Sequence, residues 1–255
     1  MNNKEIKELL DQKFHEFNTS EFIETDPISI PHRFDEKEDV EISAFLVATF
    51  AWGKREMIIR SANDLMQRLG ESPYEFIMEY SPKYEKHLDG FYYRTFQEVD
   101  VKYFIQSLNH IYKNLDGLES LFTVKEEEEG VWEALSRARK RFFELDHLQR
   151  VEKHFSNPDK NASCKRLNMF LRWMCRKDKQ GVDFGIWDSI PMSKLSCPLD
   201  VHTGNVSRSL GLLKRKQDDK KAVIELDKAL IELDPLDPVK YDFALFGLGI
   251  FEGFK

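Results

Sequence analysis

Cysteine is scarce in this chain: its 255 residues include three, Cys164, Cys175 and Cys197. Three cysteines do not make the disulfide framework of a small secreted protein, and their spacings of 11 and 22 residues match no zinc or iron–sulfur pattern. The sequence therefore predicts no metal site and no iron–sulfur cluster, and a reducing compartment fits the cysteine content. We expect the thiols to be packing residues, with Cys164 the one to test for reactivity.

Long apolar runs are also missing. No stretch of about 18 uncharged apolar residues, the length that crosses a bilayer, is present. The longest apolar runs, 44–52 and 243–251, have the length of buried helices. The start of the chain, MNNKEIKELLDQKF, lacks the continuous apolar core of a secretory signal. These absences predict a cytoplasmic protein with no membrane partner.

Glycine and proline are few, twelve and nine, against twenty phenylalanines. This balance favours packed helices over a turn-rich sandwich, and apolar residues recur at helical spacing in most segments. We predict an all-α fold with two lobes, 39–150 and 151–255, and a segment 1–38 that packs as an N-terminal extension. The helices that matter below are expected over 4–18, from Asp39 onward, 165–175, from Asp200 to about Leu213, 217–233 and 238–251.

Positive charge is outnumbered overall, since 38 Lys and Arg face 45 Asp and Glu and the net charge is −7, yet it is concentrated in one region. Residues 160–221 contain fourteen Lys or Arg and six Asp or Glu, a balance of +8, so the rest of the chain carries −15. A basic region on an acidic body is typical of a local phosphate-binding surface. A solvated, helix-rich surface explains the same charges equally well.

Two motifs in this region carry groups that can do chemistry. In SCKRLNMFLRWM, Lys165 falls in the first turn of a predicted helix. In CPLDVHTGNVSRSLGLL, Pro198 favours an extended entry and Asp200 is placed to cap the next helix. A neutral lysine amine forms Schiff bases, and a nearby carboxylate can move protons or stabilise a cation. The alternative is an exposed lysine and a purely structural cap.

The run LSCPLDVHTGNVSRSLGLL is similar to the Pro-Val-Asp-Val-His signature of the helix-hairpin-helix DNA glycosylase superfamily. SNPDKNASCKRLNMFLRWM resembles the hairpin whose second helix begins with the catalytic lysine in the bifunctional members. The long separation of the lysine and the aspartate resembles the archaeal 8-oxoguanine glycosylases. The resemblance implies a two-lobed helical fold with a cleft between the lobes, Lys165 and Asp200 as catalytic residues, duplex DNA with a damaged base as partner, and no cofactor.

One feature of the superfamily is missing. The Gly-x-Gly of the hairpin turn, which lets backbone amides approach a DNA phosphate, is replaced by a loop containing Asn157, Asn161 and Ser163. A non-catalytic nucleic-acid-binding module that keeps the fold is therefore the alternative function. The whole chain also resembles an uncharacterised bacterial family through the segments DPISIPHRF, ATFAWGKR, YRTF, CKRLNMFLRWM, CPLDVH and DPVKYDFALFGLG.

The glycosylase resemblance implies further site residues. Trp52, at the Trp-Gly-Lys-Arg junction between two helices, is a candidate for stacking on a base, and His202 and Asp242 are candidates for lining the base pocket. Core packing or helix capping are the competing roles for all three. The sequence does not reveal the lesion or the oligomeric state. The candidates for nucleic-acid binding are Lys54, Arg55, Asn161, Arg166, Arg172, Arg176 and Arg208.

Overall fold

The structure, a computed structural model, describes residues 1–254. Helices make up nearly all of the regular structure in this range, beside one antiparallel pair of two-residue strands, β1 (Tyr92–Tyr93) and β2 (Phe96–Gln97). The predicted all-α class is thereby confirmed for the described residues. The chain divides into two compact units: unit 1 is Met1–Phe22, Glu126–Trp132 and Asn157–Lys255, and unit 2 is Ile23–Lys125 and Glu133–Ser156.

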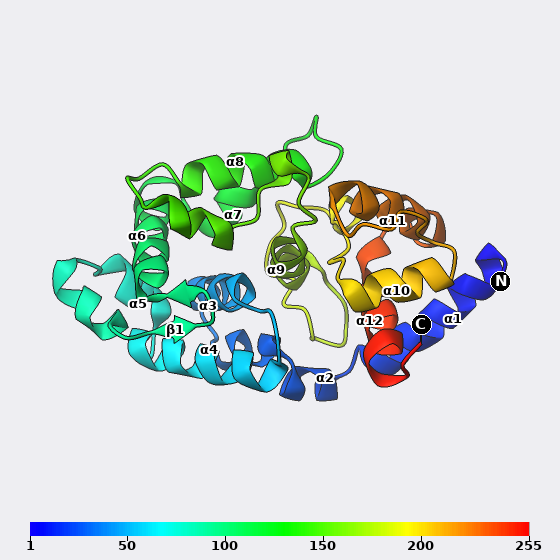
Figure 1. Ribbon diagram of the computed structural model, residues 1–255, viewed down its shortest axis with the longest axis horizontal. Helices are drawn as coiled ribbons and strands as arrows, with labels where there is room; N and C mark the ends of the chain where they lie inside the picture. The colour runs from blue at the N-terminus through cyan, green and yellow to red at the C-terminus, as the bar shows by residue number, and fades with distance from the viewer. Residues whose placement is uncertain (255) are drawn as a thin grey trace. The chain divides into compact units, whose positions relative to one another are not determined.

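Unit 1 joins the two ends of the chain. Residues 1–22, predicted as part of an extension, belong to the same unit as the C-terminal third, and Figure 1 shows both termini in it. Its α-helices are α1 (Asn3–Phe17), α9 (Lys165–Cys175), α10 (Val201–Ser209), α11 (Lys220–Leu233) and α12 (Tyr241–Phe251), and its 3-10 helices are η5 (Pro158–Lys160), η6 (Met192–Lys194) and η7 (Pro238–Lys240).

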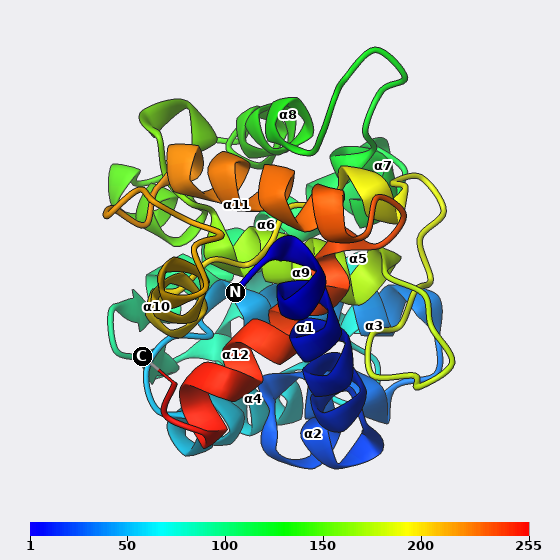
Figure 2. The same cartoon turned by 90° about the vertical axis from the view of Figure 1, so that its right-hand side faces the viewer.

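Helix α12, whose residues are nearly all apolar, forms the centre of unit 1. It packs against α1 and against α10 (Figures 1 and 2). Helix α1 turns Ile6, Leu10 and Phe14 inward at four-residue spacing, which places them on one face. On α12, Gly247 lets the ring of Phe17 come so close that a Cβ at this position would collide with it. A helix that is apolar on every side is thus covered from two directions.

Unit 2 contains the middle of the chain. Helix α2 (Ser20–Thr25) crosses from unit 1 into unit 2. The helices that follow are η1 (Pro27–Ser29), η2 (Pro31–Arg33), α3 (Lys37–Thr49), α4 (Arg55–Leu69), α5 (Pro73–Met78), η3 (Pro82–Leu88), α6 (Glu98–Asn114), α7 (Gly117–Phe122), α8 (Trp132–Phe142) and η4 (Gln149–His154).

The core of unit 2 is built from aromatic rings around α3, a helix buried from Asp39 to Thr49. Phe45 lies at the centre of this core and has a relative exposure of 1%. Its ring centroid is within 6.2 Å of four other phenylalanine rings, which come from α6, α7, α8 and the segment after η4. These neighbours are Phe104, Phe122, Phe142 and Phe155.

Two predicted helix boundaries are wrong. Asp39 does not cap the helix in which it lies, because α3 begins two residues earlier. Its carboxylate instead accepts hydrogen bonds from the Ser72 hydroxyl at 3.0 Å and the Tyr74 backbone amide at 2.7 Å, at the start of α5. Helix α10 stops at Ser209, about four residues before the predicted end, and Gly211 follows with a positive φ of 78°.

Candidate functional site

Lys165 is the first residue of α9, as predicted. The chain reaches it through two non-glycine residues in the left-handed conformation, Asn161 with φ 60° and Cys164 with φ 52°. Glycine adopts this conformation most easily, so the turn before α9 holds two other residues in a backbone conformation that is unfavourable for them. The turn before α9 contains the three-residue 3-10 helix η5 and no first α-helix, so the expected helical hairpin is incomplete at this point.

Asp200 is the N-cap of α10, also as predicted. Its Oδ1 accepts the backbone amides of His202 at 2.9 Å and Thr203 at 3.0 Å. The residues before it, from Leu195 to Leu199, are buried, which anchors the extended entry to the helix. The cap uses one oxygen of the carboxylate and leaves Oδ2 for another partner.

Lys165 and Asp200 meet in unit 1, although 35 residues separate them in the sequence. The distance from Lys165 Nζ to Asp200 Oδ2 is 3.8 Å, and the side chains are 28% and 23% exposed. The amine also lies 3.8 Å from the sulfur of Met169. An amine and a carboxylate therefore share one partly accessible position, at the start of two different helices, where both can be reached from solvent.

A second carboxylate, Asp242 on α12, lies behind this pair with a relative exposure of 6%. Its Oδ2 is paired with the guanidinium of Arg172. Its Oδ1 accepts the Thr203 hydroxyl at 3.4 Å and the Cys197 thiol at 3.9 Å. Burial raises the pKa of Asp242 to about 6, and of the nearby charges Arg172 lowers it most.

The expectation that Arg172 and Arg176 face a phosphate is wrong, because both are buried, at 4% and 1% exposure. Asp183 joins them: its two oxygens lie 3.2 Å from Arg172 Nε and 3.1 Å from Arg176 Nη1. Arg176 also pairs with Asp178 and Asp237. The two arginines thus balance buried carboxylates inside unit 1 and do not form a basic surface.

Three further candidates in unit 1 have internal partners or are mostly covered. The Asn161 side-chain amide donates to Asp219 at 2.9 Å, and Arg208 binds the carboxylate of Asp218 and the carbonyl of Arg215. Arg166 is so far desolvated that its pKa falls to about 10. The arginines of this region are therefore largely paired or covered within the protein, whereas several of its lysines are exposed: Lys160, Lys179, Lys214, Lys216 and Lys221.

His202, one of the base-pocket candidates, is exposed in the first turn of α10. Its ring lies edge-on to the ring of Phe246 of α12, at 6.5 Å between centroids. Gly249 allows this approach, since a Cβ there would come within 3.0 Å of the His202 Cβ. His202 is accessible for contact with a ligand, whereas Asp242 already uses both of its oxygens within the protein.

The candidates of the Trp52 junction lie in unit 2. The indole of Trp52 is stacked near the buried ring of His154 and lies edge-on to Tyr93, whose hydroxyl donates to the Trp52 carbonyl. Lys54 is exposed. Sequence reasoning assigned no role to Arg94, yet its guanidinium covers Gly53, where a Cβ would lie 2.7 Å away. Arg55, by contrast, lies 3.9 Å from the carboxylate of Asp26.

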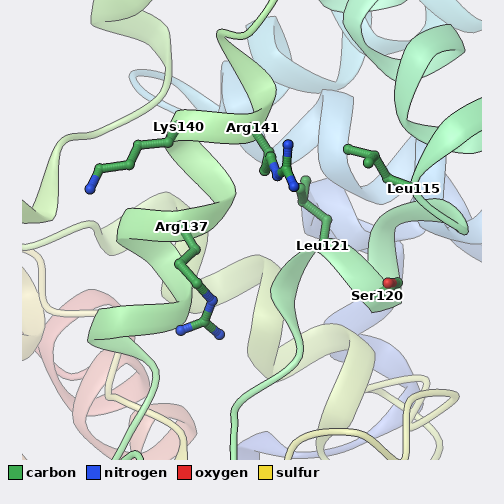
Figure 3. Close-up of a pocket in the computed structure, with 6 residues that line it drawn as sticks. All are labelled: Leu115, Ser120, Leu121, Arg137, Lys140 and Arg141. Atoms are coloured by element: carbon green, nitrogen blue, oxygen red, sulfur yellow. The ribbon is translucent and has the colours of Figure 1, made fainter.

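A pocket of about 470 Å³ in unit 2 was not predicted. In Figure 3 its three cations spread around the wall, with Arg141 close to Leu121 and Lys140 pointing away from it. Arg141 is paired with Glu144 at 3.1 Å, and Arg137 donates to a backbone carbonyl at 2.8 Å. The pocket is basic, but its cations do not converge on one point. Its lining is Leu115, Ser120, Leu121, Arg137, Lys140 and Arg141.

Fold and site together define a helical protein with a lysine–aspartate pair at two helix starts and a buried carboxylate behind it. The chain belongs to the DUF2400 family, described as a protein of unknown function, whose model matches residues 26–251. The match includes every candidate residue named above. The comparison with curated proteins found no match, and neither did the comparison with solved structures. Within residues 1–254, no helix is both long and apolar enough to cross a membrane.

Proposed function

We propose that this protein is a DNA-repair-type glycosylase with lyase activity, which removes a damaged base, such as an oxidised purine, through a Schiff base on Lys165. The single observation that carries the proposal is the 3.8 Å approach of Lys165 Nζ to Asp200 Oδ2 within one compact unit. The two residues resemble the catalytic lysine and aspartate of the helix-hairpin-helix glycosylases in sequence context. Their meeting in space meets a condition that the sequence left open.

The chemistry assigns one role to each group. The neutral amine of Lys165 attacks C1′ of the sugar, the bond from C1′ to the base breaks, and the base leaves with the electron pair and takes up a proton. The attached amine passes a proton to Asp200, the nearest carboxylate. The bond from C1′ to the sugar ring oxygen then breaks, the ring oxygen takes up that proton, and the nitrogen forms the Schiff base with C1′. While the base departs, the Asp200 carboxylate stabilises the positive charge on the sugar.

The cap of Asp200 makes this role possible. Two backbone amides bind Oδ1 and orient the carboxylate, so Oδ2 faces the amine. The alternative function is a nucleic-acid-binding module without catalysis. The internal pairing of Arg172, Arg176 and Arg208 removes cations that a tight duplex binder would use, so it counts against strong DNA binding in either function.

The test is borohydride trapping with duplex oligonucleotides that each contain one defined lesion. We expect a covalent adduct with at least one lesion, and its loss in Lys165→Gln. Asp200→Asn should slow trapping about 100-fold or more, since asparagine still caps a helix but does not carry the charge. The matched control is Lys177→Gln, which removes an exposed lysine. Trapping that survives Lys165→Gln would refute the lysine assignment, and binding without trapping would favour the module.

A further inference from the structure

The ion network behind the candidate site joins two buried arginines to four carboxylates, of which Asp183 and Asp242 are buried. Arg172 and Arg176 contact four carboxylates between them. One cation, Arg172, serves both Asp183 and Asp242. A buried carboxylate that shares its cation is poorly compensated, and it lowers its energy by holding a proton. The four carboxylates are Asp178, Asp183, Asp237 and Asp242.

Asp242 is the member of this network that reaches the candidate site. The Thr203 hydroxyl donates to Asp242 Oδ1 at 3.4 Å, while the Thr203 backbone amide donates to Asp200 Oδ1 at 3.0 Å. Thr203 has no exposed surface, so this bridge between the two carboxylates is shielded from water. Asp200 in turn lies 3.8 Å from Lys165. One residue thus connects the solvent-facing pair to the buried acid.

We propose that Asp242 is a positioning residue of the Lys165–Asp200 site: it takes up a proton when positive charge at Lys165 is lost, and so keeps the charge of the site balanced during the lysine chemistry. This inference rests on the proposed function for its catalytic meaning. The coupling between the three groups can nevertheless be measured on the free protein, without DNA.

The charges around Asp242 act on it in opposite directions. Burial raises the pKa of Asp242 to about 6, the Arg172 and Lys165 charges lower it, and the Asp200 and Asp183 charges raise it. The Thr203 hydroxyl and the Cys197 thiol donate hydrogen bonds to Asp242, and burial raises the pKa of that thiol well above its usual value. When Lys165 becomes a neutral amine, one lowering influence disappears and Asp242 binds a proton more tightly.

The experiment is a pH titration of the Asp242 side-chain carboxyl by ¹³C NMR in the full-length protein, with the signal assigned by Asp242→Asn and by triple-resonance connectivity. We expect a midpoint near pH 6 in the wild type. Lys165→Met should move the midpoint up and Asp200→Asn should move it down, each by about half a pH unit or more. Asp218→Asn, the same change at an aspartate paired with Arg208, should leave it in place.

The opposite signs make the proposal easy to refute. Shifts in the same direction, or no shift in either variant, would show that Asp242 does not respond to the charge of the pair. Both variants leave Asp242 itself unchanged, so they decide the question even if Asp242→Asn does not fold.

A second readout separates a functional role from a structural one. If trapping occurs, Asp242→Asn should remove an inflection near pH 6 from its pH profile, and an unchanged profile would overturn the catalytic meaning. If no lesion is trapped at all, the proposed function fails, while the NMR shifts still test the coupling.

Discussion

Unit 1 buries charged side chains among its helices, whereas unit 2 fills its centre with phenylalanine rings. In unit 1, Arg172 lies over the ring of Phe243 at 4.2 Å, with Asp183 and Asp242 on its other sides. In unit 2, Phe45 is surrounded by four other phenylalanine rings. Apolar packing costs no desolvation of charge, so the charged centre needs another explanation. Its position behind the Lys165–Asp200 pair suggests that this explanation is functional.

The aromatic centre of unit 2 predicts the largest effect. Phe45→Ala should lower the free energy of unfolding by about 3 to 5 kcal/mol, since it removes a buried ring and leaves a cavity among four others. The loss should be the same at pH 5 and pH 8, because the ring contacts involve no titrating group. Urea unfolding at both pH values measures it. Tyr92→Ala, at a side chain that is 74% exposed, is the control and should change little.

A strong pH dependence of the Phe45→Ala effect would break the contrast between the units, because it would connect the aromatic core to buried charges. Unit 2 does contain buried charge, for example Asp100, which is fully buried and lies 2.9 Å from Arg150 and 3.3 Å from His154.

The charged centre of unit 1 predicts the next effect. Asp183→Ala removes a carboxylate that binds both Arg172 and Arg176, and the loss of stability should be about 3 kcal/mol, as for other buried pairs broken from one side. The control is Asp188→Ala, at a side chain that is 89% exposed and paired only at the surface with Lys177. Urea unfolding compares the two. A loss no larger than that of the control would mean that the network adds nothing to stability.

Local signals in the sequence were sufficient to predict where α9 and α10 begin. Lys165 at the start of α9 and Asp200 at the cap of α10 were both predicted, because capping and apolar spacing are properties of a few neighbouring residues. The wrong assignment of Asp39 shows the limit. Its acceptor oxygen was recognised, but its donors belong to α5, more than thirty residues later.

The sequence could not predict the buried ion network, because its partners are also far apart in the sequence. Arg172 and Arg176 have the four-residue spacing of an exposed basic stripe, and only the fold shows that Asp183, Asp237 and Asp242 surround them. A useful signal was nevertheless present. Arg172 lies in α9 and Arg176 is its C-cap, and the residues between them, Trp173 to Cys175, are apolar, so an arginine buried here requires an acidic partner.

The charged centre of unit 1 should also make stability depend on pH, through Asp242, which the aromatic centre of unit 2 should not do. Burial raises the pKa of Asp242 from 3.8 to about 6, so the folded state binds the proton more tightly than the unfolded state. The resulting stabilisation is complete below about pH 4 and is lost as the pH rises through 6. Asp242→Asn mimics the neutral form, so its free energy of unfolding should not fall over this range. Relative to the wild type, the free energy of unfolding of Asp242→Asn should therefore rise by up to about 3 kcal/mol between pH 4 and pH 7. Urea unfolding across this range measures the difference, and a constant difference would contradict the assignment.

The smallest effect concerns Asp219, which joins the turn before Lys165 to α11. Its carboxylate caps α11 through the Ala222 amide at 3.1 Å and accepts the Asn161 side chain at 2.9 Å and Arg215 Nε at 2.7 Å. These bonds lower the pKa of Asp219, with Arg215 the largest cause. Asp219→Ala should cost about 1 kcal/mol, the usual value of a lost cap. Asp219→Asn keeps a capping oxygen and should cost less.

The same pair of variants tests whether the turn positions the amine. Asn161 and Cys164 hold left-handed conformations that cost energy in non-glycine residues, and Asp219 is the side chain that anchors the first of them. If this anchor supports the start of α9, Asp219→Ala should slow borohydride trapping more than its effect on unfolding accounts for, and Asp219→Asn should restore part of the rate. Equal trapping by both variants and the wild type would show that α9 holds Lys165 in place without help from the turn.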